Sequence, residues 1–143
     1  MRLIEPASAA EFEQYYQLRW KILRAPWGQP RGSERDALDA TSTHIMVIGA
    51  GKAALGVGRL HFNSISEAQI RFMAVDVGQQ RRGIGTLLVE ILETRGVALG
   101  ATRIVLDARE TALGFYCKQG YITVGPGHML FDRIAHVKMC KNL

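Results

Sequence analysis

The stretch from Gln80 to Leu99 constrains the fold more than any other part of the chain. It follows the apolar run 70–75, and its own apolar side chains recur every three or four residues, which predicts a strand, a glycine-rich turn and a helix. The first amides of a helix have no partner within the helix, and the helix dipole is positive there, so phosphate esters are natural ligands. Gly83 and Gly85 allow a sharp turn and close approach of the backbone. The stretch therefore predicts a seat for a pyrophosphate.

Other interpretations of the same glycines differ in how well they fit. A glycine-rich turn that binds nothing is the ordinary alternative for an isolated Gly-x-Gly. A dinucleotide-binding fingerprint requires a third glycine where this chain has Leu88, and a Walker loop requires Gly-Lys-Ser/Thr, which does not occur. Both nucleotide-binding alternatives are disfavoured.

Two motifs in the right order resemble the GNAT N-acetyltransferase superfamily. Gln80-x-x-Gly83-x-Gly85 is similar to the family's Arg/Gln-x-x-Gly-x-Gly/Ala, and an apolar run at 104–106 is followed by Phe115-Tyr116 and Gly120-Tyr121. The resemblance implies one domain over residues 1–143 with an α/β fold. In this fold a central mixed, mostly antiparallel sheet of six to seven strands is flanked by about four helices.

The resemblance also implies a site for acetyl-coenzyme A as cosubstrate, with no metal. Backbone amides of the turn would hold its pyrophosphate, from Gln80, Arg81, Arg82, Gly83, Ile84, Gly85 and Thr86. The preceding strand would contribute the backbone of Met73, Ala74 and Val75 to the coenzyme and to the oxyanion. Tyr116 matches the tyrosine that faces the coenzyme sulfur, as catalytic hydroxyl and coenzyme contact. Arg109 stands where the family often has an asparagine that contacts the pantetheine arm. We expect Arg109 to bind the coenzyme, with contact to a phosphate or to an acidic acceptor as the alternatives to the pantetheine contact.

The sequence is less informative about the residues that would bind the acceptor. Between residues 25 and 43 a loop with prolines, glycines and charges offers Trp27, Arg31, Glu34, Arg35 and Asp36 as acceptor contacts, although a solvated charged face explains the charges equally well. A lysine-like amine has a pKa near 10.4, so neutralising it at pH 7 costs about 4.6 kcal/mol and makes a general base useful. The sequence does not choose the base among Glu34, His44, His61, Glu67, Glu110, His128 and His136.

These features predict transfer of an acetyl or short acyl group from coenzyme A to a small-molecule or protein amine, by direct attack in a ternary complex. The alternative is a regulatory module of the same fold that binds acyl-coenzyme A without catalysis. The net charge of +5 suits coenzyme A, nucleic acid or an acidic protein, but no helix-turn-helix or aromatic-basic strand supports nucleic-acid binding. We expect no membrane association.

The remaining expectations concern the compartment, the partners and the cysteines. The N-terminus lacks a signal-peptide pattern and only Cys117 and Cys140 are present, which predicts a cytoplasmic protein. Cys117 is expected in the core, with a catalytic thiol disfavoured. The runs 19–23, 29–36 and 70–75 resemble the acetyltransferase half of bacterial proteins that also carry a hot-dog thioesterase-like domain. The resemblance leaves open whether this chain acts beside a separate hot-dog thioesterase-like partner. Whether it forms a homodimer is also open.

Local signals place the other elements. A capping box at Ser8 and Glu11 predicts a helix to about Leu23. We also expect a short helix from Ser33, a helix over 111–119, and strands over 2–5, 44–48, 54–62, 103–107, 121–124 and 134–139, with residues 125–127 ending the strand over 121–124.

Overall fold

The computed structural model describes all residues, 1–143, as a seven-stranded sheet with three α-helices. The sheet order is β1-β2-β3-β4-β5-β7-β6, and β4 with β5 is its one parallel pair. The strands are β1 (Arg2–Ile4), β2 (Thr43–Ile48), β3 (Ala54–Phe62), β4 (Glu67–Val75), β5 (Arg103–Arg109), β6 (Ile122–Leu130) and β7 (Ile134–Asn142). The helices are α1 (Ala9–Leu23), α2 (Ile84–Ala98) and α3 (Leu113–Lys118). The predicted α/β architecture is confirmed.

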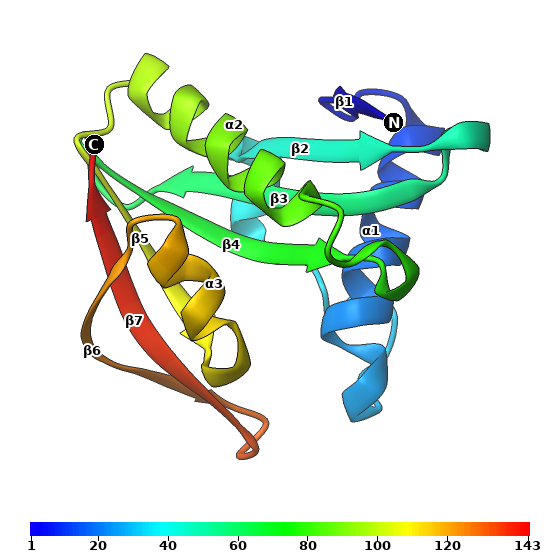
Figure 1. The fold of residues 1–143 in the computed structure, drawn as a ribbon. Coiled ribbons are helices and arrows are strands. Elements are labelled where there is room, and N and C mark those ends of the chain that lie inside the picture. Colours follow the sequence, from blue (N-terminus) through cyan, green and yellow to red (C-terminus); the bar gives the residue numbers. More distant parts are fainter.

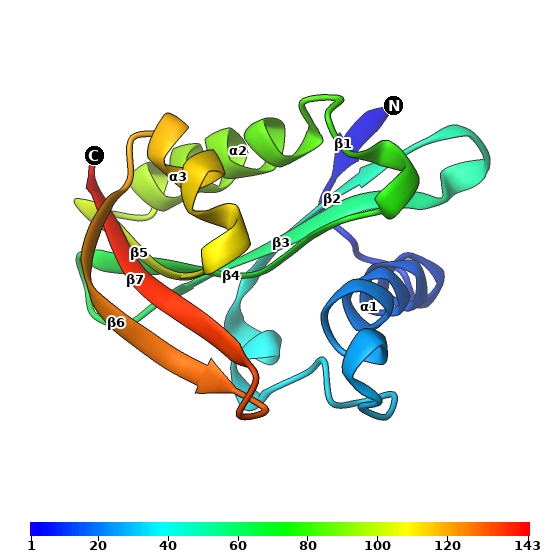
Figure 2. The same cartoon turned by 60° about the horizontal axis from the view of Figure 1, so that its bottom comes forward.

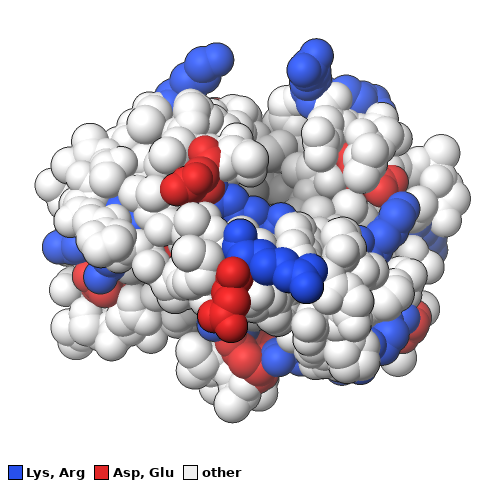
Figure 3. All heavy atoms as spheres, turned by 90° about the horizontal axis from the view of Figure 1, so that it is seen from below, with Lys and Arg blue, Asp and Glu red and all other residues white.

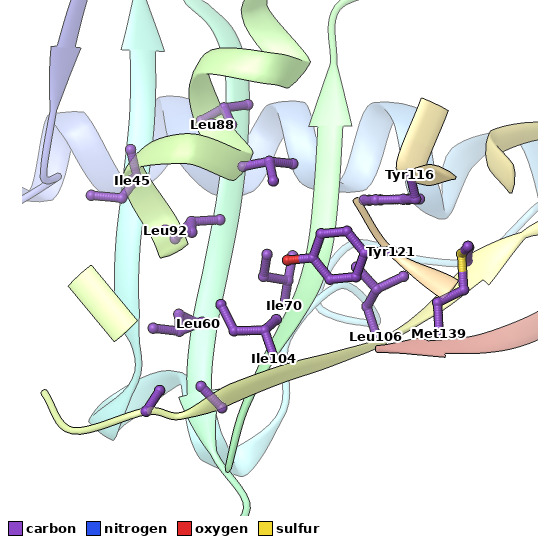
Figure 4. Close-up of a cluster of buried hydrophobic side chains, with 14 of the residues drawn as sticks. Ile45, Leu60, Ile70, Leu88, Leu92, Ile104, Leu106, Tyr116, Tyr121 and Met139 are labelled. Atoms are coloured by element: carbon purple, nitrogen blue, oxygen red, sulfur yellow. The ribbon is translucent and has the colours of Figure 1, made fainter. Parts of the chain in front are cut away.

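The helices divide between the two faces of the sheet (Figure 1). Figure 2 shows α1 on one face and α2 with α3 on the other. In Figure 4, Leu88 and Leu92 of α2 lie over the strands that carry Ile45 and Leu60, and all four side chains are buried in the larger core. A second core under α1 contains Tyr15, among others. Apolar packing on both faces holds the strands in place between the helices.

The N-terminal helix begins as the capping box predicts. Ser8 Oγ accepts a hydrogen bond from the Glu11 amide at 3.1 Å, and Glu11 Oε1 accepts one from the Ser8 amide at 3.1 Å. Two amides that have no partner in the first helical turn are thereby satisfied. The cap fixes where α1 starts.

The central strands β4 and β5 pair over a short distance only. Residues Glu67–Gln69 of β4 pair with Arg103–Val105 of β5, and beyond these residues the two strands diverge. On its other side β4 pairs with β3, and the register shifts between Val57 and Arg59. Phe72, opposite this shift, has a φ of 56°. The bulge and the divergence open the middle of the sheet, which is where the candidate functional site lies.

Three local expectations were wrong. β6 continues through Pro126 as one strand from Ile122 to Leu130, because it lies at the sheet edge, where a missing amide is tolerated and register shifts absorb the glycines. The short helix expected from Ser33 is a 3₁₀ helix over Ala37–Thr41, so the sheet has three flanking α-helices and not four. Cys117 is exposed, because α3 turns Tyr116 inward in its place.

None of the helices combines the length and the apolar composition that crossing a membrane requires.

Candidate functional site

A cleft of about 460 Å³ opens where β4 and β5 diverge. Among the residues that line it, six were predicted as site residues from the sequence: Met73, Ala74, Val75, Gln80, Arg109 and Tyr116. From Ile70 to Val75 the edge of β4 that faces β5 has no strand partner. Main-chain groups of this edge are therefore available to a molecule in the cleft.

The turn before α2 has the backbone of an anion-binding loop. Arg81 and Gly83 both have positive φ, 66° and 77°, with Arg82 between them. The first bond of the helix runs from the Leu87 amide to the Gly83 carbonyl at 3.0 Å, so the three preceding amides have no partner in the helix. A non-glycine residue at positive φ costs about 1 kcal/mol, and such strain is typical of binding sites.

Side chains of the first turn of α2 have packing roles. The Ile84 side chain is buried, and a Cβ on Gly85 would lie 3.1 Å from Phe115 of α3. Thr86 Oγ1 accepts a hydrogen bond from Gln119 at 3.1 Å. Gly85 is thus required for close contact between two helices. The contact of these residues with coenzyme A stays a prediction.

Tyr116 reaches the cleft from α3 and is 8% exposed. Its ring packs edge-on against Phe115 and Tyr121, with centroids 5.0 and 5.9 Å away. Burial raises the pKa of the Tyr116 hydroxyl above its ordinary value, so the group stays protonated at neutral pH. It is equipped to donate a hydrogen bond.

Most of the charged residues predicted in the loop 25–43 lie away from the cleft. Glu34 is fully buried and accepts a hydrogen bond from the Gly32 amide at 2.7 Å. Asp36 pairs with Arg59 of β3 at 2.6 Å, and the Arg35 guanidinium lies 3.8 Å from the Tyr16 ring centre. These groups attach the loop to the sheet and to α1, outside the cleft lining, and their contact with the acceptor stays a prediction.

Of the two other predicted loop residues, Arg31 lies away from the cleft and Trp27 lies beside it. Arg31 is exposed and pairs with Glu13 at 3.6 Å, away from the cleft lining. The Trp27 ring lies 4.6 Å from the guanidinium of Arg109, which does line the cleft. Trp27 thus meets a cleft side chain, as does Asp36, whose carboxylate lies 3.3 Å from Arg71 of the cleft lining.

The candidate general bases fall into two groups, those outside the cleft and those that line it. His44 binds Tyr15 at 2.8 Å, His61 lies 3.2 Å from Arg59, and both are buried outside the cleft lining. Glu67 pairs with Arg103 at 3.2 Å. Glu34, Glu67 and Glu110 also stand outside the lining. Of the seven predicted candidates, His128 and His136 remain in the cleft.

These two histidines stack on each other, with ring centroids 4.3 Å apart. His136 Nδ1 lies 3.0 Å from the Ile134 carbonyl and 3.1 Å from the His128 carbonyl. Because carbonyl oxygens only accept, Nδ1 carries the proton and Nε2 keeps its lone pair. Burial and the charges of His128 and Arg109 lower the pKa of His136. His136 is thus a neutral base near pH 7.

Asp107 is a cleft residue that the sequence did not predict, and Arg24 and Arg71 are two others. Asp107 Oδ2 lies 3.4 Å from His128 Nδ1. Alternation along β5 was the signal that would have found it, since Leu106 and Ala108 are core residues and Asp107 points the other way. It supplies the single carboxylate of the cleft lining.

Comparison with known proteins identifies the family. The model of the acetyltransferase (GNAT) domain family matches residues 29–143. The chain belongs to this family. It is 24% identical over 142 residues, 99% of its length, to the whole of YjcF of Bacillus subtilis (strain 168), described as an uncharacterized N-acetyltransferase. The resemblance to GNAT proteins is confirmed, whereas a hot-dog thioesterase-like partner stays a prediction.

Solved structures show the same fold. An aminoglycoside 6'-N-acetyltransferase complexed with coenzyme A superimposes with a TM-score of 0.82 and 17% identity, covering 99% of this chain and 97% of that chain. Escherichia coli ElaA does so with a TM-score of 0.81 and 18% identity, again covering 99% and 97%. At these identities the likeness concerns the GNAT fold alone.

The structure contains no group of three or more His, Cys, Asp or Glu side chains placed to hold a metal ion.

Proposed function

We propose that the chain transfers an acetyl or short acyl group from acetyl-coenzyme A to an amine, by direct attack in a ternary complex. The observation that carries this proposal is the cleft between β4 and β5, which joins the turn before α2 to Tyr116. A GNAT structure complexed with coenzyme A supports the choice of donor. Both cysteines are free thiols, which supports a reducing compartment such as the cytoplasm.

The turn before α2 suits the pyrophosphate of the donor. Arg81 and Arg82 are exposed and positive, and the amides that follow them have no partner in the helix. Gly83 is exposed, and a Cβ there would meet nothing within 4 Å, so a ligand can approach its backbone. The charges and the free amides together would hold the diphosphate.

In the reaction, the amine nitrogen attacks the thioester carbonyl carbon, and the carbon–sulfur bond breaks. Backbone amides at the free edge of β4, around Met73 to Val75, would stabilise the negative charge on the carbonyl oxygen, since they are fixed before it develops. The leaving thiolate would accept a hydrogen bond from the Tyr116 hydroxyl. A phenol with a raised pKa does not give its proton to a thiolate of pKa near 8.5, so Tyr116 acts by hydrogen bonding.

The proton of the amine requires an acceptor in the same cleft. His136 has its Nδ1 bound to backbone carbonyls, which leaves Nε2 free to take this proton directly or through water. His128 stacks on His136 and contacts Asp107, the single carboxylate near the pair. We propose His136 as the general base.

The experiment has two steps. Calorimetry first measures binding of acetyl-coenzyme A, and release of free thiol is then followed with a panel of amines. Binding together with amine-dependent thiol release supports the proposed function. Binding without release on a broad panel would support the regulatory alternative, and absence of binding would refute both.

A further inference from the structure

Three guanidinium groups but only one carboxylate line the cleft. Arg24 comes from the end of α1, Arg71 from β4 and Arg109 from the end of β5, and all three belong to the lining together with Asp107. Figure 3, which shows this side of the molecule, has a hollow between two lobes with Lys or Arg atoms near its centre. The cleft therefore carries an excess of positive charge.

The chain itself balances little of this charge. Arg24 donates only to backbone carbonyls, and Arg109 lies on the Trp27 ring without an ion-pair partner. Arg71 contacts Asp36 at 3.3 Å, but that carboxylate is already bound to another arginine. The three groups line the same cleft, and burial together with the charges of Arg71 and Arg109 lowers the pKa of Arg24. Like charges gathered in a half-buried cleft are stabilised by a bound anion.

This charge is on the opposite face of the sheet from the proposed pyrophosphate seat. Leu106 and Ala108 of β5 lie in the core under α2, so alternation places Asp107 and Arg109 on the α1 face. The contact of Arg109 with Trp27, which follows α1, agrees with this placement. Since α1 and α2 cover opposite faces (Figure 2), the anion that these arginines fit is distinct from the diphosphate at the start of α2.

We infer that the acceptor is a small amine that also carries an anionic group, as an amino acid does, and that Arg109 and Arg71 bind this anion. The inference rests on the proposed function and names its substrate class. Guanidinium groups bind carboxylate and phosphate with paired hydrogen bonds, and Asp107 beside His128 attracts the ammonium before it loses its proton. A cleft of about 460 Å³ that also admits the acylated end of the donor suits a small acceptor.

The experiment compares matched acceptors with the full chain and saturating acetyl-coenzyme A. The panel contains the standard amino acids, the amide of each, 2-aminoethyl phosphate with ethanolamine as its match without the phosphate, and spermidine as a polycation. We expect the carboxylates to exceed their amides by about tenfold or more in kcat/KM, with spermidine poorest. A preference for 2-aminoethyl phosphate over ethanolamine and over every amino acid also supports an anionic acceptor and identifies the anion as phosphate.

Variants then assign the effect to a residue. Arg109→Gln is expected to remove most of the preference for acid over amide while leaving KM for acetyl-coenzyme A unchanged. Arg103→Gln is the matched control, because Arg103 lies on the same strand outside the cleft and should change neither value. Equal rates for acids and amides, turnover of no anionic acceptor, or a raised KM for acetyl-coenzyme A in Arg109→Gln would overturn the inference. Failure to bind acetyl-coenzyme A would instead refute the proposed function.

Discussion

The guanidinium of Arg59 on β3 lies 2.6 Å from the carboxylate of Asp36, in the loop that follows α1. Arg59 is fully buried, and its second carboxylate partner, Asp39, lies 3.0 Å away. The pair fixes the loop to the face of the sheet on which the cleft opens, so loop position and fold stability depend on the same contact.

Replacing Asp36 with Asn should lower the free energy of unfolding by about 3 kcal/mol, because a buried guanidinium loses its main carboxylate partner. Urea unfolding measures the change. Glu5→Gln is the control, since it breaks an exposed Arg–carboxylate pair, with Arg95, and should cost less than about 1 kcal/mol. Equal losses in the two variants would contradict a structural role for the buried pair.

The same pair predicts how stability depends on pH. Burial alone would raise the pKa of Asp36, but the hydrogen bond and charge of Arg59 outweigh burial and hold it below its ordinary value. The resulting stabilisation is fully present above the unfolded pKa of about 3.9 and is lost as the pH falls through the lower folded value. Unfolding measured between pH 7 and pH 2 should therefore show a smaller acid-induced loss in Asp36→Asn than in the parent chain. Parallel curves would argue against this.

Gly83→Leu should weaken coenzyme A binding at least about tenfold, or about 1.4 kcal/mol, because its φ of 77° and its open backbone belong to the proposed seat. Gly83 is a cleaner test than Gly85, whose substitution also disturbs Phe115. Gly78→Leu, at an open position without positive φ, is the matched control for calorimetry. Unchanged affinity in Gly83→Leu would count against the seat.

Tyr116→Phe should lower kcat by about tenfold and leave the Kd for coenzyme A nearly unchanged, since the hydroxyl acts mainly on the departing sulfur. Steady-state kinetics and calorimetry separate the two effects. Tyr121→Phe removes a buried hydroxyl that binds Glu93 outside the cleft, and should leave kcat unaltered. A full kcat in Tyr116→Phe would exclude the hydroxyl from the reaction.

The rate should fall in acid as His136 becomes protonated. Burial first, and then His128 on β6 and Arg109 on β5, lower the pKa of His136, so the acidic limb of kcat/KM should lie below pH 6.5. His136→Gln should remove that limb and reduce the rate by about 10² or more. If the limb persisted unchanged in the variant, another group would be the base.

Local sequence patterns predicted the elements whose causes are local. Gly83 and Gly85 at their spacing predicted the turn and helix, and Ser8 with Glu11 predicted the start of α1. Pro126 was misleading, because its tolerance depends on β6 being an edge strand, which is a property of the whole sheet.

The acceptor side of the cleft was harder to predict, because its charges are sorted by tertiary contacts. Glu34 and Asp36 look like any solvated acids in sequence, yet one is buried and the other pairs with a buried arginine. Asp107 and His128 are 21 positions apart in the sequence. They come together only in the folded sheet, where β5 and β6 both pair with β7.

The most direct test of the account is a crystal structure of the chain with acetyl-coenzyme A bound. The account predicts diphosphate oxygens within hydrogen-bond distance of the amides between Arg81 and Thr86, and the sulfur near the Tyr116 hydroxyl, with the thioester between β4 and β5. A coenzyme bound elsewhere, with this turn making no contact to phosphate, would contradict it.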